Sequence, residues 1–209
     1  MNHLERRVLQ KIGENVDSPD VFADTDEGLE PIRDSLNDAI EEIAMITGGV
    51  KARYQVPLVA STFYRLQFQS GSLGWITDAW LVSQKRRLTQ TDANMLQYEN
   101  PRWLETNASP THYWPIGGDV VGFYPRSVNE DIAELHCVVI PGRYQSSRER
   151  LKLKTEYDWA AVHYATSEFW ATRGDANEAT RHFQKYLEIM GLNKVYPQAQ
   201  EKTYFSRAK

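Results

Sequence analysis

Apolar stripes with the helical period stand near both ends of this chain, and they constrain its fold more than any other feature. One stripe runs over residues 29–47, about five turns of helix, with Pro31 in the first turn and Gly48-Gly49 as a stop signal. A helix needs a partner to remove such a stripe from water. The sequence therefore predicts that this helix packs against helices from the far end of the chain. The stripe consists of Leu29, Ile32, Leu36, Ala39, Ile40, Ile43 and Thr47.

Two more long helices are predicted toward the end of the chain, and a short one at its start. Residues 155–172 combine alanines with large aromatic side chains, and Thr155 is the expected capping residue. The next helix begins at Asp175, where Glu178 three residues later completes a capping box. Residues 2–15 carry a shorter apolar stripe. These patterns indicate that both ends of the chain contribute to one helical core.

Between the helical regions the period changes from that of a helix to that of a strand. Apolar and polar residues alternate in short runs, and Gly, Pro and Asn residues separate the runs. A short helix is expected at residues 91–98, with Thr91 or Asp92 as its cap. The predicted strands are 53–58, 63–68, 75–82, 120–124 and 134–140.

We therefore expect an α+β fold. Its N- and C-terminal helices form a helical bundle, with a β-rich insertion that makes an antiparallel sheet or a small barrel. The expected boundaries are 1–49 with 147–191 for the bundle and 50–146 for the insertion. Residues 192–209 lack an apolar stripe and are expected to form an extended C-terminal arm, a frayed terminus being the alternative.

The composition is that of a folded chain. Apolar residues make up 41% and charged residues 25% of the 209 residues. No apolar run approaches the roughly 20 residues that span a bilayer, and residues 1–12 are mixed and charged. We therefore expect synthesis in the cytoplasm and no membrane partner. A single cysteine, Cys137, excludes an intramolecular disulfide framework.

Charge is distributed unevenly along the chain, although the net charge is only −4. Residues 14–42 hold eleven acids and one base, Arg33, whereas residues 143–154 hold five bases and one acid. One interpretation is a solvated acidic helix face and a basic loop. The other is a pair of complementary or DNA-repelling surfaces in an assembly, because opposed charge patches set register and steer association.

Motifs for catalysis are weak, so the sequence predicts a protein that is not an enzyme and binds no cofactor or metal. The five histidines have no metal-ligand spacing. His136 and Cys137 are adjacent on a predicted strand and point to opposite faces, so Cys137 is expected in the core. The aspartates of residues 17–26 lack the EF-hand spacing. A small hydrolase using His136 or His163 is the remaining enzymatic alternative, and His163 is expected to be a satisfied or surface side chain.

Several segments occur in a recognisable order, namely 36–43, 109–114, 122–125, 135–141, 157–165 and 179–187. In order and spacing they resemble the head-to-tail adaptor, or connector, proteins of short-tailed phages and their relatives. Ser109-Pro110 leads to the aromatic pair Tyr113-Trp114, and Phe183 takes a recurrent aromatic position in the closing helix. The resemblance covers residues 29–190, whereas residues 68–91 match nothing in the family.

The resemblance implies a structural virion protein at the head–tail junction. Copies of the chain would form a ring, about twelve in number, through head-to-tail contacts that close by rotation. The ring would join the portal protein to the tail nozzle or tail tube, and double-stranded DNA would pass through its lumen without sequence-specific binding. A tail-completion protein or an assembly chaperone with the same fold is the alternative.

Three groups of residues are candidates for these contacts. The family's C-terminal segment commonly reaches the portal, while surplus aromatic residues suit the tail or a neighbouring subunit. Acidic residues would line the lumen or form an inter-subunit face. The portal group is Tyr196, Lys202, Tyr204, Phe205 and Arg207. The aromatic group is Trp75, Trp80, Trp103 and Trp114, and the acidic group is Asp24, Asp26, Glu27, Asp34, Asp38 and Glu41.

Overall fold

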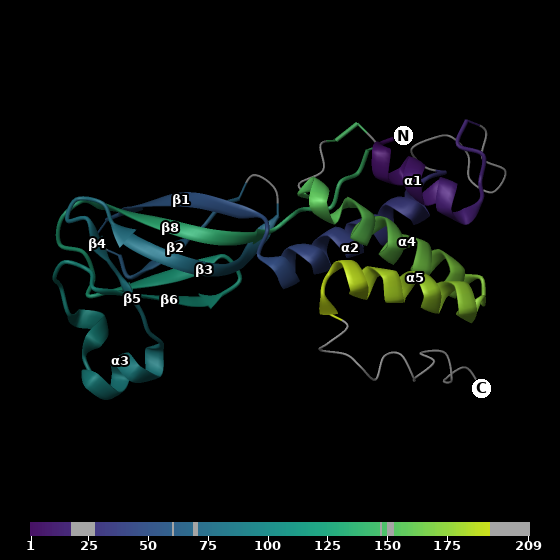
Figure 1. Ribbon diagram of the computed structural model, residues 1–209. Coiled ribbons are helices and arrows are strands. Elements are labelled where there is room, and N and C mark those ends of the chain that lie inside the picture. The colour runs from purple at the N-terminus through teal and green to yellow at the C-terminus, as the bar shows by residue number, and fades with distance from the viewer. Residues whose placement is uncertain (18–27, 60, 69–70, 147, 150–152, 193–209) are drawn as a thin grey trace. The chain divides into compact units, whose positions relative to one another are not determined.

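The computed structural model describes residues 1–17, 28–59, 61–68, 71–146, 148–149 and 153–192 (Figure 1). The chain divides into two compact units. The helical unit holds the described residues of Met1–Thr47 and Arg143–Lys209, and the β unit holds those of Gly48–Gly142.

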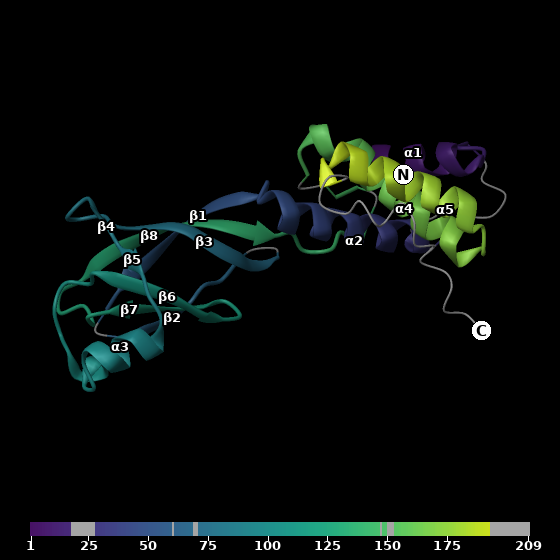
Figure 2. The same ribbon diagram turned by 60° about the horizontal axis from the view of Figure 1, so that its bottom comes forward.

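Four α-helices build the helical unit: α1 (His3–Ile12), α2 (Glu30–Thr47), α4 (Asp158–Thr172) and α5 (Ala176–Ile189). Helix α4 contacts each of the other three, as Figures 1 and 2 show. Its buried apolar residues lie on several sides, among them Ala160, Ala161 and Val162. A helix that is apolar on most of its circumference is stable only when other elements cover it.

Side-chain caps explain where two of these helices, α1 and α5, begin. The Asn2 side chain accepts hydrogen bonds from the backbone N–H groups of Leu4 and Glu5, and the Glu5 carboxylate accepts one from the backbone N–H of Asn2, which completes a capping box. Asp175 accepts from the N–H of Glu178 at the start of α5. The expectation that Thr155 caps a helix is wrong, because residues 155–157 form a 3₁₀ turn and α4 begins only at Asp158.

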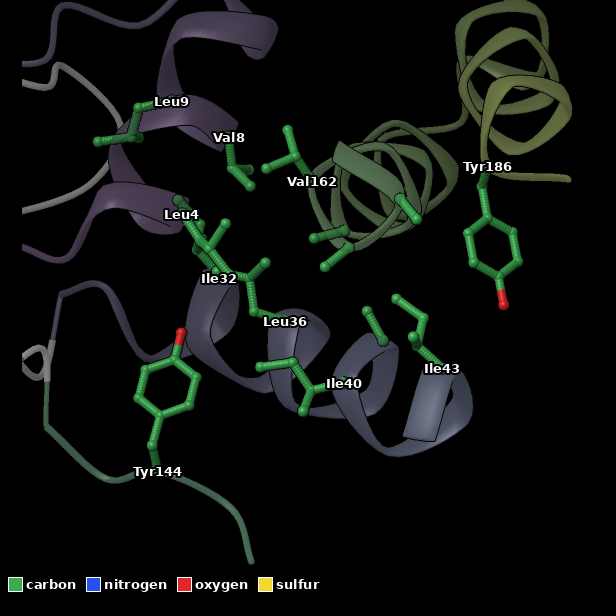
Figure 3. Packing of buried hydrophobic residues seen from close by; sticks show 14 of the residues in the cluster. Leu4, Val8, Leu9, Ile32, Leu36, Ile40, Ile43, Tyr144, Val162 and Tyr186 are labelled. Atoms are coloured by element: carbon green, nitrogen blue, oxygen red, sulfur yellow. The ribbon is translucent and has the colours of Figure 1, made fainter. Parts of the chain in front are cut away.

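Aliphatic side chains from α1, α2 and α4 meet in the core of the helical unit. Figure 3 shows Leu4 and Val8 beside Val162, with Ile32 and Leu36 of α2 below them, and each is at most 3% exposed. Burying a side chain of this kind stabilises a fold by about 1.5–3 kcal/mol. The stripe predicted from the sequence thus faces residues more than a hundred positions further along the chain.

Two open four-stranded sheets build the β unit. The first has the order β1-β8-β3-β4, with β1 (Lys51–Leu58), β8 (Asp131–Ile140), β3 (Ser72–Leu81) and β4 (Arg86–Arg87). The second has the order β2-β7-β6-β5, with β2 (Phe63–Arg65), β7 (Val120–Tyr124), β6 (His112–Gly117) and β5 (Thr89–Gln90). The strand pairs are antiparallel except β5–β6.

The two sheets share one apolar core. Val56, Ile76 and Leu135 of the first sheet belong to the same buried cluster as Val121 and Phe123 of the second. The α+β class with antiparallel sheets is therefore confirmed, whereas the closed barrel, one of the two predicted alternatives, does not form. Strand β6 was not predicted, since Pro115 and Gly117 interrupt its alternation.

A second aromatic core lies where helix α3 (Ala93–Glu99) and a 3₁₀ turn (Trp103–Glu105) meet β6. Leu96, Trp103 and Trp114 are buried there, and the two indole rings make an edge-to-face contact at 5.2 Å between centroids. Asp92 caps α3 by accepting from the N–H groups of Asn94 and Met95. The short helix predicted at residues 91–98 is thereby confirmed.

Gly122 of β7 leaves the space that the Trp114 ring fills. A Cβ at this position would lie 2.4 Å from Cε2 of Trp114, and Trp114 is only 4% exposed. We expect Gly122→Ala to lower the free energy of unfolding of the β unit by about 2–3 kcal/mol, because the ring cannot move without disturbing Trp103. Urea unfolding followed by tryptophan fluorescence measures this.

The matched control is Ile116→Ala on the neighbouring strand, where the side chain is 47% exposed. This control is expected to change the free energy of unfolding by less than about 0.5 kcal/mol. Equal effects of the two substitutions would contradict a packed Trp114.

Candidate interaction surfaces

The outer side of α2 carries the described members of the acidic group. Asp34 and Asp38 are exposed, and Arg143 binds both, with Nη1 donating to Asp38 at 2.7 Å and Nη2 to Asp34 at 3.5 Å. Glu41, one turn beyond Asp38, is half-buried. Exposed pairs of this kind contribute at most about 1 kcal/mol. Their larger effect is that Arg143 partly neutralises the charge of Asp34 and Asp38.

Polar side chains of α2 also hold the segment that follows Arg143. The Asn37 amide donates to the carbonyl of Tyr144 at 3.1 Å and accepts from its N–H at 3.0 Å. Arg33 donates through Nη1 to the carbonyl of Gln145 at 2.8 Å. Because both donors are buried, these bonds replace water for backbone groups that no strand or helix satisfies. Residues 143–145 are thereby fixed along α2.

A buried ion pair links α1 to α2. Arg33 Nε lies 3.4 Å from Glu5 Oε1, and the two residues are 5% and 0% exposed. The second oxygen of Glu5 accepts from the N–H of Asn2 at 2.7 Å, as part of the capping box. The Glu5 carboxylate therefore caps the start of α1 and also pairs with the Arg33 guanidinium of α2.

A second acidic region lies where α2 approaches α4 and α5. The Tyr186 hydroxyl donates to Glu42 at 2.7 Å. Burial raises the pKa of the Glu168 carboxyl, and the negative charges of Asp38 and Glu42 raise it further. Two exposed apolar side chains, Met45 and Ile46, follow on the next turn of α2 and are 51% and 45% exposed.

This surface mixes negative charge with exposed apolar area, and we name it the acidic–apolar face. It comprises Asp38, Glu41, Glu42, Met45, Ile46 and Glu168.

A different side of α4 carries an exposed tryptophan under two cations of α1. Trp159 is 44% exposed, with the Arg7 guanidinium 4.8 Å and the Lys11 Nζ 5.4 Å from its ring centroid. Arg7 also donates to Asp158 at 3.2 Å, which holds it over the ring. We name Arg7, Lys11 and Trp159 the basic–aromatic patch. Cations on an exposed indole ring form a surface that suits an anionic partner with apolar groups.

Beneath this patch, two histidines from different helices form a buried pair. His163 of α4 and His182 of α5 lie with their Nδ1 atoms 2.9 Å apart, and they are 8% and 6% exposed. Burial lowers the pKa of His163 to about 4, and the charge of His182 adds to this effect. Burial likewise lowers the pKa of His182. At neutral pH both rings are therefore neutral, and one Nδ1–H donates to the other Nδ1.

The four tryptophans of the aromatic group divide between core and surface. Trp103 and Trp114 are 8% and 4% exposed and pack on each other, so they hold the β unit together and present little surface. Trp80 is half-buried and donates through Nε1 to Asp78 at 2.7 Å. Trp75 is 41% exposed. The interface prediction therefore narrows to Trp75 and Trp80.

Hollows in the β unit lie where β1 and β3 end and β8 begins. One, of about 540 Å³, is lined partly by the apolar residues Val59, Val82 and Ile132, which are 40–53% exposed. Its polar neighbour, of about 280 Å³, is lined by serines and by Glu130 and Asp131. Both are open depressions of the surface.

Neither His136 nor Cys137 has the surroundings of a catalytic group. Cys137 is buried, and burial raises the pKa of its thiol to about 11, which keeps it protonated. His136 on the opposite face of β8 contacts Glu134 at 2.9 Å. The core position predicted for Cys137 is confirmed.

Neither a metal-binding cluster nor a membrane-spanning helix occurs within the described ranges. Within those ranges, no three His, Cys, Asp or Glu side chains gather so that they could hold a metal ion. No described helix combines the length and the hydropathy that crossing a bilayer requires.

Several predicted contact residues lie outside the described part of the chain. These are Asp24, Asp26 and Glu27 of the acidic group and the whole portal group, Tyr196, Lys202, Tyr204, Phe205 and Arg207.

The helical unit carries the acidic–apolar face and the basic–aromatic patch, and the β unit carries the exposed Trp75, which are surfaces of the kind that bind other proteins. The family model described as SU10 adaptor protein matches residues 4–208. The chain belongs to this family of phage head–tail adaptors, which confirms the resemblance seen in the sequence. No curated protein matches the chain.

Family membership gives the chain its general role. It is a structural phage adaptor of the head–tail junction, and it interacts with head and tail components of the virion. Membership of a structural family also supports a non-enzymatic protein.

Proposed function

We propose that the chain is one subunit of a ring, about twelve copies in number, that joins the portal of the phage head to the tail nozzle or tail tube. The observation that carries this proposal is the match of residues 4–208 to the adaptor family. The fold supports it, because the two units offer separate surfaces to different partners.

In this ring the C-terminal residues 193–209 bind the portal. They carry a net positive charge and three aromatic side chains, Tyr196, Tyr204 and Phe205, of the kind that anchors an interface. The β unit presents Trp75 and Trp80 to the tail or to a neighbouring subunit. Packaged double-stranded DNA passes through the lumen without sequence-specific binding.

The acidic group has two possible places in such a ring. Residues that line the lumen would repel DNA most strongly with their full charge. Arg143 partly neutralises Asp34 and Asp38, which favours an inter-subunit face for them and for Glu41. Asp24, Asp26 and Glu27 remain candidates for either position.

Truncation after Leu192 tests the portal contact. Leu192 packs on the helical core, so the truncated chain keeps that contact and is expected to unfold at the same temperature as the full chain. Its affinity for purified portal is expected to fall by more than about thirtyfold, the loss typical of removing interface anchors. Biolayer interferometry with immobilised portal measures this.

Point substitutions distinguish the contribution of the aromatic side chains to portal affinity from the contribution of the length of the C-terminal arm. Tyr204→Ser with Phe205→Ser is expected to reproduce most of the loss, whereas Tyr98→Ser, at an 86% exposed position of the β unit, is expected to change nothing. Unchanged portal affinity of the truncated chain would contradict the proposed contact. Cryo-electron microscopy of the virion neck tests the ring itself, and particles without this protein at the junction would overturn it.

A further inference from the structure

We propose that neighbouring subunits of the ring meet by placing the basic–aromatic patch of one copy on the acidic–apolar face of the next. This inference rests on the proposed ring and adds which two surfaces of the helical unit form its repeating contact. The partner is a second copy of this chain.

The patch has the composition of an interface centre. Trp159 is 44% exposed although it is the largest type of side chain, and Arg7 is already ordered over its ring by Asp158. Tryptophan and arginine are the residues most enriched among those that dominate binding energy. Because Arg7 is held in place before binding, little side-chain entropy remains to be lost when a partner arrives.

The acidic–apolar face offers the complementary chemistry. Met45 and Ile46 supply apolar area for an indole ring, and Glu41 supplies negative charge one turn away. Burial raises the pKa of the Glu168 carboxyl, and the negative charges of Asp38 and Glu42 raise it further. Cations from a second molecule would relieve this repulsion, so the face binds positive charge better than it binds a copy of itself.

The placement of the two surfaces allows repetition of the contact. Trp159 and His163 of α4 lie toward α1 and its cations, whereas Tyr164 and Glu168 lie toward Glu42 of α2. The two surfaces thus occupy different sides of α4. Contact between different surfaces of identical chains is heterologous, which leaves one free surface of each kind and permits a ring.

Cross-linking in assembled particles tests the pairing. A chain with both Lys11→Cys and Glu41→Cys, treated with a flexible bismaleimide, is expected to give a ladder of covalent oligomers from the virion neck. Each single substitution is expected to give monomer, because the two positions belong to different surfaces. The native Cys137 is 1% exposed and buried in the β unit, so it does not contribute.

Charge exchange supplies a second, independent measurement. Lys11→Glu and Glu41→Lys are each expected to reduce incorporation of the chain into particles by about tenfold, as a like-charge contact at an interface does. The two substitutions together are expected to restore incorporation. Arg6→Glu is the matched control on the same helix, where the side chain is exposed and outside the patch, and it is expected to be neutral.

The outcomes separate this inference from the proposed function. Particles that contain a ring of this protein, yet give neither a ladder nor charge-exchange rescue, overturn the pairing and leave the ring intact. A ladder from a single-cysteine chain indicates a symmetric contact and also overturns the pairing. Particles that lack the ring overturn both proposals. If Lys11→Glu weakens only DNA retention in the neck, the patch faces DNA, which overturns the pairing too.

Discussion

Replacing Glu5 with alanine is expected to lower the free energy of unfolding of the helical unit by about 3–5 kcal/mol. The substitution removes the buried carboxylate that pairs with Arg33 at 3.4 Å, and breaking a buried ion pair is strongly destabilising. It also removes the side chain that completes the capping box of α1. Urea unfolding followed by the helical circular dichroism signal measures the loss.

Two variants show whether the loss of stability in Glu5→Ala comes from breaking a buried ion pair. Arg181→Ala breaks a pair with Glu178 of similar distance, 3.1 Å, but on the surface, and its expected effect is below about 1 kcal/mol. Glu5→Leu combined with Arg33→Met removes both buried charges and is expected to be less harmful than Glu5→Ala alone. A single loss as small as that of Arg181→Ala would refute the buried pair.

Acid is expected to weaken the helical unit through the His163–His182 pair. In the unfolded chain His163 titrates near its ordinary pKa of 6.5, whereas burial lowers its pKa to about 4 in the folded protein. Between these values the unfolded chain binds more protons, so stability falls as the pH falls through this window. The contribution is fully present above about pH 6.5 and is lost by about pH 4, which amounts to about 3 kcal/mol.

Measurements of unfolding free energy at several pH values between 4 and 7 follow this loss. His163→Phe removes the ring whose pKa burial lowers to about 4 and is expected to flatten the dependence. His112→Gln, in the β unit, is expected to leave the dependence of the helical unit unchanged. If the wild-type stability did not vary over this range, the two rings would not be held neutral in the fold.

Local signals in the sequence predict where the helices lie. Pro31 lies in the first turn of α2 and Gly48 follows its last residue, and the helix runs from Glu30 to Thr47, within one residue of the predicted range. Asp175 starts α5 as expected. These signals depend only on neighbouring residues, so a single sequence contains them.

The contacts that give the surfaces their character depend on residues far apart in the chain. Glu5 and Arg33 are 28 positions apart, and His163 and His182 are 19 positions apart. No local sequence motif therefore predicts that either pair is in contact. Of the two alternatives expected for His163, a satisfied or a surface side chain, the structure shows the first, but its partner His182 could not be predicted. The basic–aromatic patch was missed for the same reason, because Trp159 meets Arg7 and Lys11 only through the packing of α4 on α1.

The tryptophans show how composition alone misleads. The middle of the chain holds more tryptophans than the core of a small sheet requires, and this surplus predicted that they lie on the surface as interface anchors. Trp103 and Trp114 instead fill a second core under α3. One signal was available, since Gly122 stands opposite Trp114 in the register of β6 and β7 and provides room for its ring.

The pairing of β1 with β8 has a consequence for how such chains diversify. Val139 donates to the carbonyl of Val50 at 2.9 Å, and Lys51 stands opposite Val138, so the outgoing and returning strands run side by side at the root of the β unit. Because its first and last strands pair with each other, the insertion begins and ends at one place and can be replaced as a whole. Recombination with crossovers near positions 47 and 143 would exchange the β unit for an insertion of another length while leaving the residues of α1, α2, α4 and α5 unchanged.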